Sequence, residues 1–473
     1  MVYFIRKHSS FHNMALCFVT LYAYLRRPCI AGGKSYAAPH QLAFSITFIF
    51  SLFAYLNTVS PSIAGGDSGE LVSEGCNLGT SHPPGYPLYT IIVFFVTKFG
   101  TLLFPNARSK AWMVNVTSCI FGSIASSLLA SSVALLLRGK TNHNVNSCSN
   151  ICRQSRASPK KNKALMEQRE NFKSDVIHVT AATTVGLLHS FSPLVWQYST
   201  TAEVFALNNL FVALLVHASI CFALERSLKY YLRGAFVCGM ALTHQHTSIL
   251  LSVPMIAWVF YTTGLYNPRR WGVTLNNGKR CNLITLAACS FLSSFVMLYA
   301  TLPLFAMLYP HAGSWGNVKS VVGFINHFRR KDYGTLQLFS GNDNESEDCM
   351  QRTFLWAKDF VCDQGSPFLA VCFVIGCAEA LTREYKRWSG KKQFRSGRPA
   401  RNDRRKSERK TALDSIFHFQ GPGIEMAIFY ALVFYLLVFH SLANLPLNNQ
   451  LYFGIHQVSL LVGRLLLHLS FIN

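Results

Sequence analysis

The chain has 473 residues, of which 50% are hydrophobic and only 14% are charged, and its formal net charge is +23. Soluble domains carry about 25% charged residues, so this composition excludes an ordinary soluble protein and indicates a chain that lies mostly in lipid. The positive charge is concentrated in two connectors, residues 138–175 and 383–410. Such connectors are typical of cytoplasmic loops between membrane spans. The charge therefore gives no reason to expect a nucleic-acid partner.

Residues 1–40 mix basic side chains with a short apolar run, and we expect them to form a cytoplasmic N-terminus. The first membrane span is predicted over residues 41–59, which places residues 60–111 on the opposite, lumenal side. Within this first lumenal loop, the apolar run 88–104 is short for a span and carries a lysine near its middle. If it crossed, the basic connector 138–175 would be lumenal. We therefore favour a helix along the lumenal interface and keep a crossing as the alternative.

Apolar and polar stretches alternate in the rest of the chain, which predicts further membrane helices. These spans cover residues 112–137, 176–195, 204–224, 234–262, 282–307, 364–382, 423–443 and 457–471. The stretch 234–262 is too long for one helix and is interrupted by Thr243-His244-Gln245-His246-Thr247, so we expect two shortened helices that meet at the lumenal side. The pattern predicts an all-α polytopic membrane protein with about ten transmembrane helices over residues 41–471. It also predicts a lumenal loop at 308–363 and a basic cytoplasmic insert at 383–416.

The 14 cysteines are scattered along the chain and form no CxxC framework, so we expect no zinc site. Cys349 and Cys362 fall in the predicted lumenal loop, and the sequence is compatible either with a disulfide between them or with two free thiols. A glycosylation sequon at Asn344 lies in an exposed position of the same loop. The sequon at Asn115 is too close to the predicted membrane for use.

The most distinctive stretch is Ala64-Gly65-Gly66-Asp67-Ser68-Gly69-Glu70, followed by Ser81-His82-Pro83-Pro84-Gly85-Tyr86-Pro87. Glycines and prolines predict an irregular loop, and the two carboxylates of Asp67 and Glu70 stand just past the first apolar span. A polar loop at a membrane edge is where a membrane enzyme would hold a general base. A solvated turn between two apolar segments is the structural alternative.

Three other polar groups fall on the same predicted side of the membrane, and ionisable residues at the edges of spans indicate functional sites. They are Glu203, the pair His244 and His246, and the cluster His327, Arg329, Arg330, Lys331 and Tyr333. Each has a structural alternative: the carboxylate can cap the next helix, the histidines can be hydrogen-bonded core residues, and the basic cluster can be a solvated face. The cluster can also hold a lipid phosphate through charge-assisted bonds.

A carboxylate beside a cationic cluster suits transfer from a lipid-phosphate sugar donor. The cations would bind the leaving phosphate, and the acceptor hydroxyl would need a base within hydrogen-bonding reach. The sequence contains no P-loop, no Rossmann glycine pattern and no metal motif, so we expect no metal and no bound cofactor. A glycosidase is less well supported, because its two carboxyl groups are normally far apart in sequence.

Five blocks of the chain carry a family resemblance. They read GGDSGELVSEGCNLGTSHPPGYPL, FSPLVWQYSTTAEVFALNNLF, ALTHQHT, SWGN…GFINHFRRKDYGT and HSLANLPLNNQLYFGIHQ. In order and spacing they resemble the transmembrane protein 260 family of protein O-mannosyltransferases, over roughly residues 41–457. The resemblance implies a fold like that of the polytopic glycosyltransferase C superfamily, with an acidic residue in the first lumenal loop.

The resemblance implies a multi-pass enzyme of the endoplasmic reticulum membrane with a lumenal active site. Its donor would be dolichyl-phosphate mannose, and mannose would be transferred with inversion to Ser/Thr hydroxyls of secretory-pathway proteins such as immunoglobulin-like domains of plexins and receptor kinases. Asp67 would be the catalytic base, with Glu70 as its neighbour or a second base. We expect the donor and acceptor to be bound by residues from all four polar groups: His82, Glu203, His244, His246, His327, Arg329, Arg330 and Tyr333.

Two features depart from the family. After Val458-Ser459-Leu460 the sequence does not resemble the family's continuation, so we expect that the family's lumenal C-terminal domain is absent, as in a truncated isoform. The inserts 138–175 and 390–412 are longer than in the family and have the composition of disordered connectors. Two other functions stay open: a transporter or lipid flippase, which predicts inverted repeats, and a membrane scaffold that tolerates changes at Asp67.

Overall fold

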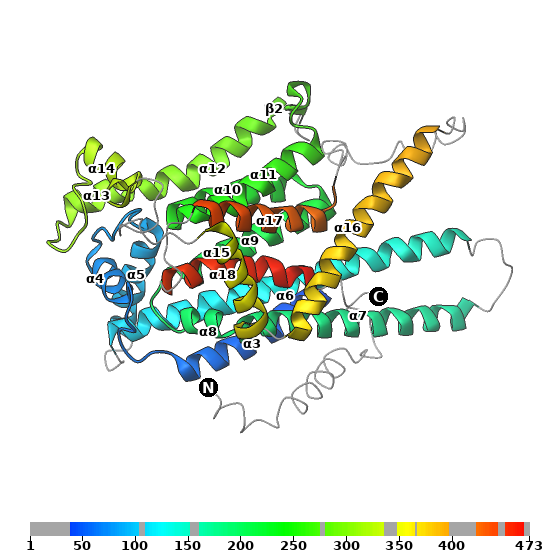
Figure 1. Ribbon diagram of the computed structural model, residues 1–473, viewed down its shortest axis with the longest axis horizontal. Helices are drawn as coiled ribbons and strands as arrows, with labels where there is room; N and C mark the ends of the chain where they lie inside the picture. Colours follow the sequence, from blue (N-terminus) through cyan, green and yellow to red (C-terminus); the bar gives the residue numbers. More distant parts are fainter. Residues whose placement is uncertain are drawn as a thin grey trace.

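The structure is a computed structural model, in which helices dominate the described part of the chain (Figure 1). The described residues are 38–103, 109–151, 160–274, 280–334, 348–364, 367–396, 422–442 and 450–467. Five of the helical segments within them are long and apolar enough to cross a membrane. They are α3 (Pro39–Thr58), α6 (Lys110–Ile151, up to Arg138), α9 (Phe205–Glu225), α12 (Leu283–Tyr299) continued by α13 (Thr301–Leu308), and α17 (Ile424–Leu442). The predicted all-α, multi-pass membrane protein is therefore confirmed.

The remaining helices are shorter or less uniformly apolar. They are α4 (Ser68–Asn77), α5 (Pro87–Leu103), α7 (Lys160–Ser190), α8 (Pro193–Ser199), α10 (Leu228–His244), α11 (Ile249–Thr263), α14 (Val321–Phe328), α15 (Cys349–Lys358), α16 (Pro367–Ser396) and α18 (Gln450–Leu466). Single helical turns are η2 (His246–Ser248), η3 (Pro268–Arg270), η4 (Lys331–Tyr333) and the π-helical η6 (Asp359–Asp363). A small antiparallel hairpin, β1 (Gly272–Thr274) with β2 (Arg280–Asn282), was not predicted.

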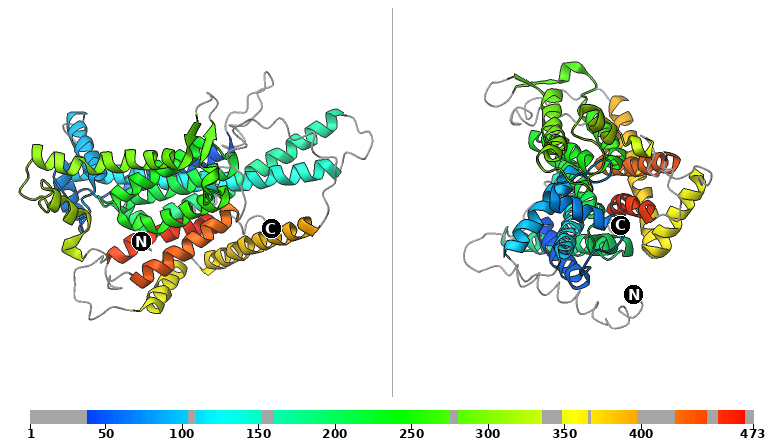
Figure 2. Two further views of the ribbon diagram at one scale, coloured as in Figure 1. Left: turned by 90° about the horizontal axis from the view of Figure 1, so that it is seen from above. Right: turned by 90° about the vertical axis from the view of Figure 1, so that its left-hand side faces the viewer.

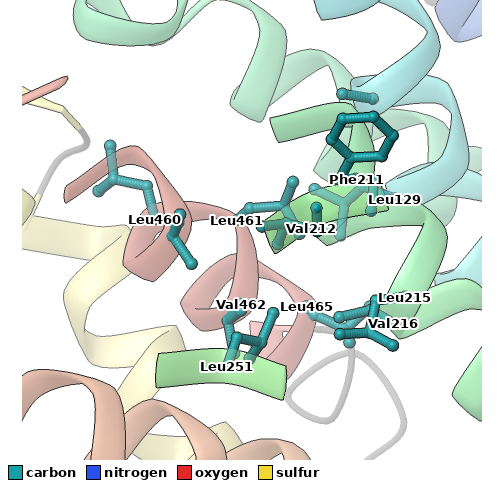
Figure 3. Packing of buried hydrophobic residues seen from close by; sticks show 14 of the residues in the cluster. Leu129, Phe211, Val212, Leu215, Val216, Leu251, Leu460, Leu461, Val462 and Leu465 are labelled. Carbon is teal, nitrogen blue, oxygen red and sulfur yellow. The ribbon is translucent and has the colours of Figure 1, made fainter. Parts of the chain in front are cut away.

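Helices α6, α9, α11 and α18 meet in the core of the bundle (Figure 3). Helix α9 is buried on nearly every face because its residues are apolar or small all round. Leu461 of α18 packs towards α9, and Val462 lies beside Leu251 of α11. The amide of Asn209 in α9 donates a hydrogen bond of 2.7 Å to Oε1 of Gln457, so a polar contact also fixes α18 in the core.

The predicted break in 234–262 is confirmed, because α10 ends at His244 and α11 starts at Ile249 after the turn η2. A second break separates α7 from α8. Arg464 of α18 is buried against this break, where its Nη1 donates to the backbone carbonyl of His189 at 3.3 Å and its Nη2 to that of Gln364. Backbone groups freed at a helix break need such partners within a membrane bundle. Arg464 therefore ties α18 to the broken helix.

We expected the two basic connectors to be disordered, but the parts of them that the structure describes are helical. Helices α6 and α7 extend into 138–175, and α16 continues to Ser396; all three project from one end of the bundle (Figure 1). The last predicted span, 457–471, begins earlier, at Gln450. Cys349 and Cys362 are free thiols, so the disulfide does not form. The Asn344 sequon lies outside the described residues.

The opposite end of the bundle carries α4, α5, α13 and α14 (Figure 1). Two segments there hold the polar motifs: residues 59–86, here called the first loop, and residues 309–334, called the second loop. Helix α5, which follows the first loop, runs across the end of the bundle rather than along it (Figure 2). This is the orientation expected of an interfacial helix.

Candidate active site

A cavity of about 990 Å³ opens where the two loops meet the helix ends. Its polar lining comes from both loops, the α8–α9 connection and the α10–α11 break: Asp67, His82, Gln197, Thr201, Glu203, Gln245, His246, Arg329, Arg330 and Tyr333. Its apolar lining comes mainly from the helices and includes Leu250, Phe291, Phe295, Phe439 and Ile455. The cavity therefore combines ionisable groups with walls suited to a hydrocarbon chain.

Asp67 lies directly before α4 and presents its carboxylate to the cavity, where 49% of the side chain is exposed. Its backbone N–H donates a hydrogen bond of 3.1 Å to Oε1 of Glu203. Gly66 makes this contact possible, because a Cβ there would stand 2.7 Å from the same oxygen and its φ of +59° favours glycine. Asn115 supports the loop from α6 through bonds to the carbonyls of Ser60 and Ser62, which explains its burial.

Glu70 holds His82 in place. The backbone N–H of His82 donates to Glu70 Oε1 at 2.6 Å, and its Nδ1 lies 3.1 Å from the same oxygen. Burial raises the pKa of Glu70, but the hydrogen bonds from His82 oppose it, and the pKa lies below its usual value. With the proton on Nδ1, Nε2 accepts from the Tyr86 hydroxyl at 3.2 Å. The same Nε2 lies 3.8 Å from Oδ2 of Asp67, so the His82 ring lies between the two carboxylates without a hydrogen bond to Asp67.

Glu203 lines the cavity beside Asp67 but is itself buried. Burial raises its pKa to about 8, and the neighbouring Asp67 charge adds to this, while backbone hydrogen bonds from Asp67 and Ser68 oppose it. At neutral pH Glu203 is therefore mostly protonated, so it adds no full negative charge beside Asp67. A carboxylic acid and a carboxylate side by side are a common arrangement in active sites.

The two histidines at the α10–α11 break differ. His244 is fully buried, with Nε2 2.7 Å from the carbonyl of Val204 and its ring against Tyr86 and Phe211. His244 is therefore a hydrogen-bonded core residue, which was the alternative to a role in binding, and it supports the segment that carries Glu203. His246 lines the cavity, with Nε2 2.8 Å from the Tyr299 hydroxyl.

The second loop brings two arginines to the cavity. Arg329 and Arg330 both line it, and the Arg330 guanidinium lies 4.9 Å from the centroid of Tyr333. Within the described residues, Nε of Arg330 is buried without a hydrogen-bond partner. His327 lies behind this wall, packed against Gly85 and Gly316, and burial lowers its pKa to about 4. It is therefore neutral at physiological pH and unsuited to pair with a phosphate.

Residues from all four predicted polar segments line one cavity, although not every predicted residue faces it. Asp67, His82, Glu203, His246, Arg329, Arg330 and Tyr333 line it, whereas Glu70, His244 and His327 stand behind its wall. The expectation that these three side chains contact the donor or acceptor was therefore wrong, and they support the residues that line the cavity. Tyr86 and Trp315 were missed: Tyr86 bonds His82 and lines the cavity, and the Trp315 ring lies 6.3 Å from that of His82. The sequence feature that could have indicated Tyr86 is its position four residues after His82.

Residues 67–269 match the family model of the Protein O-mannosyl-transferase TMEM260 N-terminal domain. The chain is 27% identical over 427 residues to Protein O-mannosyl-transferase tmem260 of Dictyostelium discoideum, covering 88% of this chain and 41% of the relative. It is 32% identical over 300 residues to Protein O-mannosyl-transferase TMEM260 of Mus musculus, covering 62% of this chain and 34% of the relative. The chain thus spans less than half the length of both relatives. The match over residues 67–269 and the similarity to both relatives support assignment of the chain to the TMEM260 family.

Proposed function

We propose that the chain is a glycosyltransferase that moves mannose from dolichyl-phosphate mannose to Ser/Thr hydroxyls of secretory-pathway proteins. One observation carries the proposal: a half-exposed carboxylate, Asp67, and two arginines, Arg329 and Arg330, line the same largely apolar cavity. The names of the two relatives support the transfer of mannose to protein. The apolar walls suit the lipid part of the donor.

In the proposed reaction, the acceptor hydroxyl oxygen attacks C1 of mannose from the side opposite the phosphate. Asp67 takes the hydroxyl proton, the bond between C1 and the phosphate oxygen breaks, and its electrons leave with dolichyl phosphate. The configuration at C1 is inverted. Arg329 and Arg330 stabilise the charge that develops on the leaving phosphate, where the orphaned Nε of Arg330 supplies a free donor within the described residues.

The remaining polar residues of the site support the proposed base and the two arginines. His82 is held by Glu70, and its Nε2 lies 3.8 Å from Oδ2 of Asp67, so its ring borders the proposed base. Glu203 is neutral and fixes the backbone at Asp67 without adding a second negative charge. His246 and Tyr333 are placed to bind the sugar or the acceptor, since both line the cavity.

We also infer that the site lies on the lumenal side of the endoplasmic reticulum membrane, in a fold like that of the glycosyltransferase C superfamily with about ten crossings. The inference is supported by the basic ends of α6, α7 and α16, which project from the end opposite the site (Figure 1). Tag accessibility in sealed microsomes would check it. A tag inserted in the second loop should be protected from added protease, and one after Ser396 should be cleaved.

The broken helix α10–α11 also fits a lipid flippase, because such breaks form binding sites in transporters. One experiment separates the two functions. The purified full chain in lipid is given dolichyl-phosphate mannose labelled in the sugar and an immunoglobulin-like acceptor domain. Label that becomes covalently bound to the acceptor supports transfer. Label that only moves across a vesicle membrane supports the flippase and overturns the proposal.

A further inference from the structure

Glu74 is a buried carboxylate that lies outside the cavity. It projects from α4, where its side chain is only 3% exposed, and reaches the second loop. The Ser314 hydroxyl donates to its Oε2 at 2.8 Å, and Nδ1 of His311 lies 3.2 Å from its Oε1. A buried carboxylate persists only where partners compensate for the lost water. Among these contacts the hydrogen bond from Ser314 does so, and it joins the second loop to α4.

Two glycines make room for this carboxylate, one in each loop. A Cβ at Gly79 would stand 2.0 Å from Oε2 of Glu74, and a Cβ at Gly313 would stand 3.0 Å from Oε1. With Glu74 and Ser314 in their observed positions, no Cβ fits at Gly79. The backbone of both loops is therefore shaped around Glu74.

The loops are also paired by their backbones next to Glu74. The N–H of Thr80 donates to the Ser314 hydroxyl at 3.0 Å, and the N–H of Trp315 donates to the carbonyl of Thr80 at 2.8 Å. Ser314 thus receives one hydrogen bond from the first loop and donates another to Glu74. Removing the carboxylate would leave this pairing without its buried acceptor.

A chain of aromatic contacts leads from this pairing to the cavity. The Trp315 ring lies 6.3 Å from that of His82 and stacks on Tyr333 at 6.5 Å. Tyr333 in turn lies under the guanidinium of Arg330 at 4.9 Å. Trp315 therefore contacts a residue on each side of the proposed site: His82 beside the base, and Tyr333 under Arg330.

We propose that Glu74 is a positioning residue: it fastens the second loop to the first and so sets the distance between the base and the phosphate-binding arginines. The inference rests on the proposed function and deepens it. Glu74 does not line the cavity, so it takes no part in proton transfer. Its effect on catalysis passes through Ser314, Trp315 and Tyr333.

The test compares wild type with Glu74→Ala and Glu74→Gln in the purified full chain in lipid nanodiscs. Ser73→Ala is the matched control, because Ser73 is exposed on the same helix. The first readout is hydrogen–deuterium exchange of the peptide that contains Trp315. Exchange should be at least tenfold faster in Glu74→Ala, intermediate in Glu74→Gln and unchanged in Ser73→Ala. Unchanged exchange in Glu74→Ala overturns the inference.

The second readout is the split between KM and kcat for dolichyl-phosphate mannose. Misplaced arginines should raise the KM of Glu74→Ala at least tenfold, and Glu74→Gln should recover part of this loss. A merely structural role would lower the active fraction, so kcat would fall while KM stayed unchanged, and that result contradicts the inference. The Kd for dolichyl phosphate compares the same variants by binding alone, without requiring mannose transfer. If wild type neither transfers mannose nor binds the lipid, the proposed function fails, and the exchange readout alone decides the role of Glu74.

Discussion

The backbone N–H of Asp67 donates to Oε1 of Glu203 at 3.1 Å, so the proposed base is held by an acid from a distant segment. Both residues line the cavity, where the first loop meets the α8–α9 connection. The contact also places two carboxyl groups side by side, and the buried one, Glu203, keeps its proton up to a pH of about 8.

This contact predicts a pH dependence of stability. The folded pKa of Glu203, about 8, lies above its ordinary value of 4.5, so folding favours the protonated form. Its contribution to stability is complete below pH 4.5 and is lost as the pH rises towards 8, at a slope of at most about 1.4 kcal/mol per pH unit. Glu203→Gln cannot titrate, so its melting temperature should fall less than that of wild type between pH 5 and about 8. Thermal unfolding of both proteins checks this, and parallel curves would contradict it.

The two arginines predict a loss of donor affinity. Arg330→Ala removes a charge-assisted contact worth about 1.5–3 kcal/mol, which corresponds to a rise of roughly 10- to 150-fold in the KM for dolichyl-phosphate mannose. Arg330→Lys should recover only part of it, because lysine lacks the planar fork. Lys331→Ala is the matched control, since Lys331 is exposed and does not line the cavity. An equal effect of Lys331→Ala would indicate a diffuse positive field instead of a phosphate site.

The buried Arg464 predicts a stability effect. Arg464→Met fills similar space but leaves the carbonyls of His189 and Gln364 without this donor. Losing two buried hydrogen bonds should cost about 2–5 kcal/mol, and the melting temperature should fall accordingly. Lys229→Met, at an exposed position, is the control. Equal melting temperatures for both variants would show that Arg464 does not hold α18 in the core.

The reaction is also expected to proceed without a metal ion. Arginines line the cavity where a leaving phosphate would need cations, and in the described ranges no three His, Cys, Asp or Glu side chains are grouped as a metal site would require. Mannose transfer should therefore be the same, within about twofold, with and without EDTA. Activity that EDTA abolishes and a divalent metal restores would contradict this expectation.

Much of the fold follows from local sequence. Apolar stretches predict the helices, and the polar run Thr243–Thr247 predicts the α10–α11 break, because both signals depend only on neighbouring residues. The expectation that the polar segments lie on one side of the membrane came from counting the predicted membrane crossings between them. The composition of the connectors led to the interpretation that they are disordered, yet α6, α7 and α16 continue into them. In α7 and α16 the continuation is rich in lysine, arginine and glutamate, which are also good helix formers.

The orientation of side chains could not be predicted in the same way. Glu70 and His327 lie in motifs next to cavity residues but point into its wall, which depends on contacts with other segments. Glu74 was missed because its partners, His311 and Ser314, come from the far second loop. No local pattern distinguishes it from an exposed helical glutamate.

The most direct test of the account is transfer of labelled mannose from dolichyl-phosphate mannose to an immunoglobulin-like acceptor by wild type and Asp67→Asn. The amide keeps the shape of the side chain and the backbone contact to Glu203 but cannot accept the proton. Transfer should fall by about 10²-fold or more, with the melting temperature unchanged. Glu170→Gln makes the same chemical change at an exposed carboxylate on α7 and should transfer normally. Full activity of Asp67→Asn beside an active wild type would contradict the assignment of Asp67 as the base.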